Sequence, residues 1–178
     1  VHGTTITLMN AFRKILTKGE NTKGKIFLTS GLGGMSGAQP KAGDITECIT
    51  VCAEVNEKAA VKRHEQGWAS ILIKDMDELV TRVKKAQHDK EVLSIAFHGN
   101  IVDVWEKFDS ENIFVHVGSD QTSLHNPWSG GYYPVGLSFE EANELISTDP
   151  TLFKEKVQES LRRQAESRLQ TSISHMQC

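Results

Sequence analysis

Four glycine residues follow a short apolar run near the start of the chain, and their spacing is typical of a phosphate site. The apolar run covers residues 26–29, and the glycines are Gly31, Gly33, Gly34 and Gly37. Glycine tolerates positive φ and has no Cβ, so it allows a tight turn and lets ligand oxygens approach the backbone. If a helix begins at residue 36 or 37, its free N–H groups attract anions. The pattern predicts a turn that binds the pyrophosphate of a dinucleotide.

The spacing departs from the G-x-G-x-x-G fingerprint of dinucleotide-binding proteins, because Ser36 stands where the third glycine is expected. A flexible turn without a ligand is the alternative interpretation. The apolar run at residues 49–55 favours a ligand, because it contains Glu54 about 20 residues beyond the turn. A carboxylate there accepts hydrogen bonds from a ribose 2′-hydroxyl and repels a 2′-phosphate. The sequence therefore predicts NAD rather than NADP as the ligand.

Polar residues also follow two later apolar runs. Residues 98–100 (HGN) follow the run at 92–97, and residues 120–125 (DQTSLH) follow the run at 113–117. Ligands of open α/β sheets bind outside the carboxyl ends of the strands, so both clusters are candidates for binding. The residue types alone favour the alternative, in which each cluster is a loop that caps the next helix and contains a structural histidine.

Three aromatic residues lie in the segment after the second cluster, namely Trp128, Tyr132 and Tyr133. Large aromatic side chains with a polar atom either line cofactor pockets or pack at structural surfaces. The sequence leaves both interpretations open.

Apolar runs alternate with segments of helical periodicity along the chain, which predicts right-handed βαβ units. The expected fold is α/β, a Rossmann-like parallel sheet with helices on both faces. We expect a single domain over residues 1–178, with an N-terminal helix in 1–20, the sheet in 21–136 and C-terminal helices in 137–178.

Several residues are typical of helix starts. Asn56 and Asp75 are good N-caps, and Ser138 with Glu141 fits a capping box. The last helix is expected from Pro150. Its polar end (RRQAESRLQ) is expected to be solvated or docked on a partner that is missing from this chain.

Composition excludes several classes of partner. The formal charge of −3 over 178 residues is too small to indicate nucleic acid or a membrane surface. No apolar segment approaches the roughly 18 residues of a membrane span, so we expect a soluble, cytoplasmic protein. The cysteines Cys48, Cys52 and Cys178 lack metal-ligand spacing, so we expect buried or terminal thiols and no metal site. The chain begins with valine and ends in a helical pattern, so we expect a fragment of a larger enzyme.

Three segments resemble the NAD-binding domain of the urocanase family, the urocanate hydratases of histidine degradation: GKIFLTSGLGGMSGAQPKAG, SDQTSLHNPWSGGYYPVGLSFEEAN and QESLRR. The similarity covers essentially the whole chain. It implies a homodimeric enzyme with tightly bound NAD⁺, in which this domain is inserted into a core domain that is absent here. It also implies a hydro-lyase that adds water to urocanate to give imidazolonepropionate, with NAD⁺ as a covalent electrophile.

The resemblance implies cofactor-binding residues by position. They belong to the glycine turn, the acidic ribose ligand, the pair after the later strand, the loop beside the cofactor and a tyrosine pair: Gly33, Gly34, Met35, Ser36, Gly37, Glu54, Asn100, Ile101, Gln121, Thr122, Ser123, Leu124, His125, Tyr132 and Tyr133.

The resemblance also implies differences and gaps. Ala59 stands where family members often have arginine, and Lys58 or Lys62 is the expected substitute. No catalytic residue is assigned in this chain, because the family's catalytic cysteine lies in the core domain. Asp120 and His125 are hypothesised to face the nicotinamide.

Two other functions remain open at this point. One is an NAD-dependent dehydrogenase domain that transfers hydride, and the other is a non-catalytic nucleotide-binding module. The chain alone is expected to be inactive but to keep some affinity for NAD.

Overall fold

A five-stranded parallel sheet forms the centre of the computed structural model, which describes residues 1–34, 36–120 and 127–174. The strands run in the spatial order β3-β4-β2-β1-β5, and every neighbouring pair is parallel. Their bounds are β1 Ile26–Ser30, β2 Ile49–Glu54, β3 Ile71–Ile73, β4 Leu93–His98 and β5 Val117–Gly118. The predicted α/β fold with a parallel sheet is confirmed.

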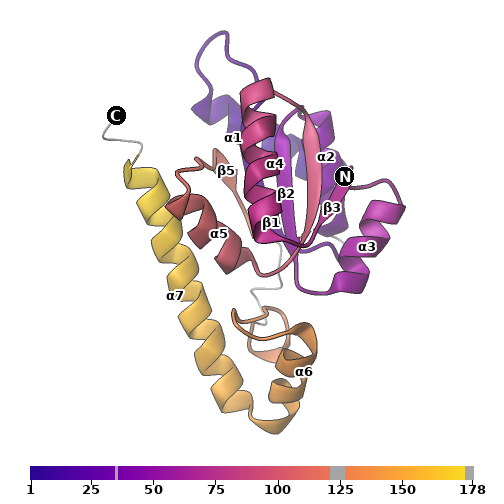
Figure 1. The fold of residues 1–178 in the computed structure, drawn as a ribbon, viewed down its shortest axis with the longest axis vertical. Helices are drawn as coiled ribbons and strands as arrows, with labels where there is room; N and C mark the ends of the chain where they lie inside the picture. Colours follow the sequence, from indigo (N-terminus) through magenta and orange to yellow (C-terminus); the bar gives the residue numbers. More distant parts are fainter. Residues whose placement is uncertain (35, 121–126, 175–178) are drawn as a thin grey trace.

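Helices cover both faces of the sheet (Figure 1). On one face lie the helices that precede β1, β2 and β3, and on the other lie α4 and α5, with α7 outside α5. The bounds are α1 His2–Ile15, η1 Ser36–Ala38, α2 Gln39–Ile45, α3 Glu57–Glu65, α4 Met76–Asp89, α5 Ile101–Ser110, η2 Pro127–Ser129, α6 Phe139–Thr148 and α7 Pro150–Ser174.

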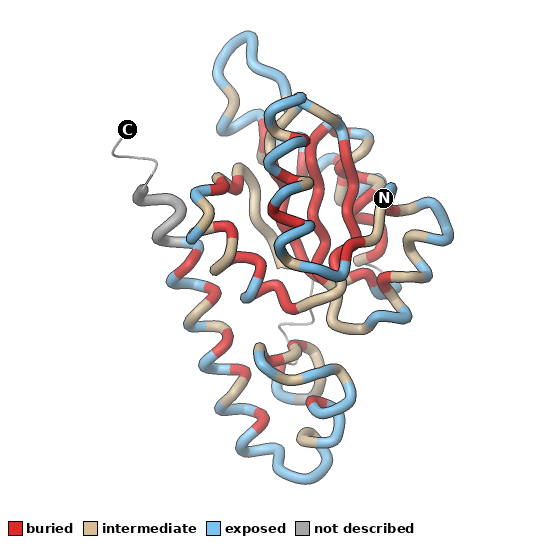
Figure 2. Tube along the Cα trace, in the orientation of Figure 1, coloured by how far each residue is buried: buried red, intermediate tan, exposed pale blue. Residues whose placement is uncertain are grey.

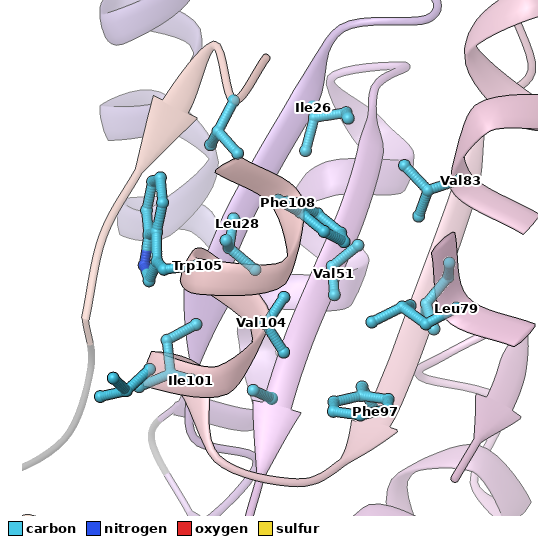
Figure 3. Close-up of a cluster of buried hydrophobic side chains, with 14 of the residues drawn as sticks. Ile26, Leu28, Val51, Leu79, Val83, Phe97, Ile101, Val104, Trp105 and Phe108 are labelled. Atoms are coloured by element: carbon cyan, nitrogen blue, oxygen red, sulfur yellow. The ribbon is translucent and has the colours of Figure 1, made fainter. Parts of the chain in front are cut away.

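The largest group of buried apolar side chains lies between the sheet and the helices α4 and α5. Figure 3 shows strand residues facing helix residues across this layer, among them Ile26, Leu28, Val51, Leu79, Val83, Phe97, Val104 and Phe108. The three central strands β4, β2 and β1 are buried on both faces, which explains their nearly continuous apolar sequence. Burial of this layer fixes the sheet against which the loops at the strand ends are positioned.

The strand register places the candidate residues at one edge of the sheet. Ser30 pairs with Ala53, and Glu54 pairs with His98. The carboxyl ends of β1, β2 and β4 are therefore neighbours. The glycine turn, Glu54 and the segment after His98 meet there, as predicted from their positions after strands.

The last strand is shorter than the predicted run of residues 113–117. The N–H of Ile113 donates to the carbonyl of Phe108 and so closes the end of α5, away from the sheet. The Nδ1 atom of His116 accepts a hydrogen bond of 3.0 Å from the N–H of Ile26. The first N–H group of β1 is therefore bound by a side chain, where a longer neighbouring strand would offer a backbone carbonyl. Within the described residues, the pairing of this last strand with β1 is limited to Val117 and Gly118.

The helix starts predicted at Asn56, Asp75 and Ser138 are confirmed. The Asn56 side chain accepts the N–H groups of Lys58 and Ala59, and the Asp75 side chain accepts that of Glu78. Ser138 and Glu141 form a complete capping box at α6.

The inner side of α7 packs along α5 of the same chain. The sequence predicts that the polar end of this helix is either solvated or docked on a missing partner, and it does not predict packing within the chain. Phe153 and Val157 are fully buried, and Gln164 is 5% exposed. Arg163 donates two hydrogen bonds, of 2.7 and 2.8 Å, to the carboxylate of Glu106 on α5. Buried positions recur along one side of α7 in Figure 2. This helix is therefore part of the domain.

None of the helices in the described ranges combines the length and the apolar character that crossing a membrane requires.

Candidate functional site

A cavity of about 200 Å³ opens at the carboxyl ends of β1, β2 and β4. Its walls come from the glycine turn, from the end of β2, from the start of α5 and from the glycine-rich segment before α6. The predicted cofactor residues that line it are Gly33, Ser36, Glu54, Asn100, Ile101, Tyr132 and Tyr133. Seven residues predicted from four separate parts of the sequence thus surround one cavity.

The glycine turn leaves the sheet directly after Ser30. Gly31 has a φ of +91°, a conformation that side chains with a Cβ rarely adopt, and its N–H donates to the carbonyl of Ala53 at 2.8 Å. The turn closes with the N–H of Gly37 donating to the carbonyl of Gly33 at 3.0 Å. A 3₁₀ turn at Ser36 then precedes α2.

The helix after the turn is shorter than predicted. The sequence predicts a helix from residue 36 or 37 to about residue 48, whereas α2 spans Gln39–Ile45 and the 3₁₀ turn covers Ser36–Ala38. Its end is set by Thr46, whose hydroxyl donates to the carbonyl of Ala42 at 2.9 Å. Because α2 has so few turns, its dipole is small, and the groups at this point that can donate to an anion are the N–H groups of the glycine turn.

Glu54 is held in place by two backbone groups. Its Oε2 atom accepts the N–H of Leu32 at 2.7 Å, and its Oε1 atom accepts the N–H of Asn56 at 2.9 Å. The carboxylate is half-buried and lines the cavity. A carboxylate has about four acceptor positions, so each oxygen can still accept a hydroxyl group.

Asn100 connects the start of α5 to the segment before α6. Its Oδ1 atom accepts the N–H of Val102 at 2.9 Å, and its Nδ2 atom donates to the carbonyl of Tyr133 at 2.9 Å. The neighbouring Ile101 is 5% exposed and belongs to the core. The tyrosine backbone is thereby fixed against the cavity wall.

The two tyrosines differ in environment. Tyr132 is 1% exposed, and its hydroxyl donates to Oε1 of Gln164 at 2.8 Å. Burial, and secondarily the charge of Asp120, raises the pKa of Tyr132 well above its ordinary value, so this phenol stays neutral. Tyr133 is half-buried, and its hydroxyl donates to Oδ1 of Asn143 at 3.1 Å. Both tyrosines line the cavity, but the hydroxyl of Tyr132 is buried against α7, whereas the ring of Tyr133 packs on Phe139 with 5.0 Å between the ring centroids.

A second cavity of about 380 Å³ adjoins the first, because Val55, Gly99 and Asn100 line both. His98 lines the second cavity together with Leu137. The two cavities extend the recess along the edge of the sheet from the glycine turn toward the start of α6. Such an elongated recess suits a ligand with two linked halves.

The sequence model of the family Urocanase Rossmann-like domain matches residues 1–176. The chain belongs to this family. It is 54% identical over 168 residues to the protein named urocanate hydratase from Mus musculus, and 52% identical over 165 residues to the probable urocanate hydratase from Caenorhabditis elegans. It is 34% identical over 163 residues to the probable urocanate hydratase from Halobacterium salinarum. Each alignment covers 92% of this chain, but only 25%, 24% and 28% of the respective relative. The chain thus spans about a quarter of the length of these relatives.

Some residues predicted for the site of this urocanase domain lie elsewhere. Gly34 is exposed and Gly37 is buried behind the turn, so neither lines the cavity. Met35 and residues 121–125 lie outside the described residues. Trp128 is 38% exposed, with Nζ of Lys154 5.3 Å from its ring centroid.

Arg63 is a residue of this urocanase domain that the sequence did not predict. Its Nε atom donates to the carbonyl of Leu32 at 2.9 Å, and its Nη2 atom donates to the carbonyl of Gly33 at 2.5 Å. The side chains of Lys58 and Lys62, the expected substitutes for a family arginine, are exposed. The positively charged side chain that reaches the glycine turn is therefore Arg63, which lies one helical turn after Ala59 on α3.

A network of polar side chains behind the cavity was also missed. Ser30 donates to Oδ1 of Asp120 at 2.6 Å, and Gln164 donates to Oδ2 of Asp120 at 3.3 Å. Gln39 donates to the carbonyl of Ser30 at 3.1 Å. Two of these residues are glutamines without a recognisable motif, so only the fold identifies them. The network fixes Asp120, the last described residue before position 121.

Proposed function

We propose that the cavity between the glycine turn, Glu54 and Asn100 binds NAD⁺, and that the chain is the NAD-binding domain of a urocanate hydratase. One observation carries the proposal. The carboxylate of Glu54 lines the same cavity as the glycine turn and is aimed there by the N–H groups of Leu32 and Asn56.

The residues fit the parts of a dinucleotide. The N–H groups of the glycine turn suit the pyrophosphate, and Glu54 suits the hydroxyls of the adenosine ribose. The negative charge of Glu54 disfavours the 2′-phosphate of NADP⁺. Asn100, Ile101, Tyr132 and Tyr133 would enclose the nucleotide from the opposite wall. The remaining contacts, Gly34, Met35, Gly37 and residues 121–125, stay predictions from the resemblance.

The reaction is proposed from the family and the names of the relatives. When bound, NAD⁺ would supply an electrophilic nicotinamide ring, and water would be added to urocanate to give imidazolonepropionate. The residues of this chain would bind and orient the cofactor. The groups that transfer protons are expected in the rest of a longer polypeptide, a core domain that residues 1–20 and 137–178 would join. We therefore expect the chain alone to lack hydratase activity.

Two further features extend the proposal. The full-length enzyme is expected to be a homodimer, and its substrate and pathway indicate a cytoplasmic location. Neither nucleic acid nor a membrane is proposed as a partner.

The test uses the full-length polypeptide that contains this chain. We expect urocanate absorbance to disappear without any rise in NADH absorbance, and Glu54→Ala to reduce turnover at limiting NAD⁺. Glu65→Gln, an exposed carboxylate change on α3, is the control that should leave turnover unchanged. Accumulation of NADH would instead support a dehydrogenase. NAD⁺ binding without urocanate loss would support a non-catalytic nucleotide-binding module.

A further inference from the structure

The guanidinium of Arg63 contacts two successive carbonyl groups of the glycine turn. The Nε and Nη2 atoms donate to the carbonyls of Leu32 and Gly33, respectively, 31 and 30 residues earlier in the chain. Two neighbours hold the guanidinium itself. Its Nη1 atom donates to Oε1 of Gln66 at 3.0 Å, and its Cζ atom lies 5.3 Å from the ring centroid of Trp68.

Two held carbonyls also fix the direction of two N–H groups. In a trans peptide unit, the C=O of one residue and the N–H of the next point in opposite directions. The described peptide bonds contain no cis unit. With the carbonyls of Leu32 and Gly33 turned toward Arg63, the N–H groups of Gly33 and Gly34 point away from it. Gly33 lines the cavity, whereas Arg63 does not. The side of the turn that lies opposite Arg63 is therefore the side that faces the cavity.

We propose that Arg63 is a positioning residue for the cofactor, which holds the glycine turn with the N–H group of Gly33 presented to the pyrophosphate in the cavity and that of Gly34 turned away from Arg63. This inference rests on the proposed binding of NAD⁺. Arg63 acts through the backbone rather than as a phosphate ligand, because its hydrogen bonds go to carbonyl oxygens. A free turn would lose part of this order, and its carbonyl oxygens could rotate toward the anion and repel it.

The planar fork of arginine is required for this role. Two carbonyls on adjacent residues match two N–H groups at a fixed separation on the guanidinium. A lysine would keep the charge but offers a single ammonium centre on a flexible stem. The lysine variant therefore separates the proposed geometry from a general effect of positive charge.

Gly37 provides the space that the guanidinium occupies. A Cβ at this position would lie 2.3 Å from Nε and 2.5 Å from Cζ of Arg63. The guanidinium is the end of a flexible side chain, so Gly37→Ala would displace it from the carbonyls rather than disrupt the sheet. The absence of a Cβ at Gly37 therefore leaves room for the guanidinium, although Gly37 does not line the cavity.

The first test measures the Kd of NAD⁺ for the chain by calorimetry. We expect Arg63→Lys, Arg63→Gln and Gly37→Ala each to raise Kd at least tenfold, while the exposed control Lys85→Gln changes it less than twofold. The double variant Gly37→Ala with Arg63→Gln should bind within twofold of the weaker single variant, because both changes remove the same contact. A wild-type Kd for Arg63→Lys would overturn the proposal, and so would full additivity in the double variant.

The second test needs no nucleotide and so decides the inference even if this chain fails to bind NAD⁺. Hydrogen exchange of the Gly37 amide reports the turn, because that N–H donates to the Gly33 carbonyl. We expect Arg63→Gln and Arg63→Lys to accelerate this exchange at least tenfold, with no change at the core amide of Val51. Lys85→Gln should change neither. Equal Gly37 exchange in wild type and both Arg63 variants would contradict the role of Arg63 in holding the turn.

Discussion

The side-chain amide of Asn100 donates a hydrogen bond of 2.9 Å to the backbone carbonyl of Tyr133, which lies 33 residues further along the chain. The same side chain caps α5 through the N–H of Val102. One residue thereby joins the helix that follows β4 to the segment that forms the far wall of the cavity. This double use distinguishes Asn100 from Asn56, whose side chain caps α3 in the same way but makes no comparable bond to a distant segment within the described residues.

Replacing the two asparagines separates the cap from the connection to Tyr133. Loss of a cap costs about 1 kcal/mol, so Asn56→Ala should lower the free energy of unfolding by that amount. Asn100→Ala should cost roughly 1–3 kcal/mol more, because the Tyr133 carbonyl loses its donor. Urea denaturation of both variants measures the difference.

The aspartate variants sharpen this comparison. Asn56→Asp keeps the acceptor at the positive end of α3, so stability should be unchanged or slightly higher. Asn100→Asp removes the donor and places a carboxylate against a carbonyl oxygen, so stability should fall. Equal effects at the two positions would show that the bond to Tyr133 contributes nothing.

Two helical glycines should respond oppositely to alanine. A Cβ at Gly43 would lie 1.7 Å from Oγ1 of the buried Thr50, whereas a Cβ at Gly3 would meet nothing within 4 Å. Gly43→Ala should destabilise the domain by about 1–3 kcal/mol through overpacking. Gly3→Ala should leave stability unchanged or raise it by up to about 1 kcal/mol, because alanine favours helix. Thermal denaturation checks both, and a neutral Gly43→Ala would contradict the close packing of α2 on β2.

Much of the fold was predictable because its signals are local. Apolar runs gave the strands, and Asn56, Asp75 and Ser138 gave helix starts, since caps act within one turn of sequence. The position of Glu54 was predictable because it ends the apolar run that follows the glycine turn, at a spacing typical of dinucleotide-binding sheets. These features need no knowledge of distant contacts.

The remaining features depend on contacts between distant segments. Arg63 sits in an ordinary charged helix, and only the packing of α3 beside the turn brings it to Leu32 and Gly33. Gln164 similarly meets Tyr132 only because α7 folds back along α5. The shortening of β5 follows from the hydrogen bond between the N–H of Ile113 and the carbonyl of Phe108, which holds Ile113 at the end of α5. Single residues without a motif give no signal for such pairings.

Alkaline pH should weaken the fold through its buried thiols. Burial raises the pKa of Cys52 well above its ordinary value, so in the folded state this thiol stays protonated at pH values where it ionises in the unfolded chain. The folded state then binds more protons, and stability falls as pH rises above about 8.5, by up to about 1.4 kcal/mol per pH unit for each such thiol. Burial raises the pKa of Cys48 in the same direction.

The contribution of Cys52 can be isolated by substitution. In urea denaturation at a series of pH values, Cys52→Ala should show a shallower loss of stability than the parent between about pH 9 and 10.5. Parent and variant should show the same pH dependence between about pH 6 and 7.5, where both thiols are protonated in either state. Identical slopes in the alkaline range would mean that the Cys52 thiol ionises in the folded protein.

Docking of α7 depends on its buried aromatic residue. Phe153 is fully buried in the main core, whereas the adjacent Leu152 is 40% exposed. Phe153→Ala should destabilise the domain by about 3–5 kcal/mol, and Leu152→Ala by under about 1 kcal/mol. Chemical denaturation of the pair gives the comparison. Equal small effects would indicate that α7 does not pack on the domain in solution.

Calorimetric titration of the chain with NAD⁺, and separately with NADP⁺, tests the central proposal most directly. We expect NAD⁺ to bind more tightly than NADP⁺, and Glu54→Gln to weaken NAD⁺ by roughly 10- to 150-fold, which corresponds to about 1.5–3 kcal/mol for a hydrogen bond to a charged group. Glu54→Gln should also reduce the ratio of the Kd for NADP⁺ to the Kd for NAD⁺. The control Glu65→Gln should leave both affinities unchanged. Equal NAD⁺ affinity in wild type and Glu54→Gln would contradict the placement of the cofactor in this cavity.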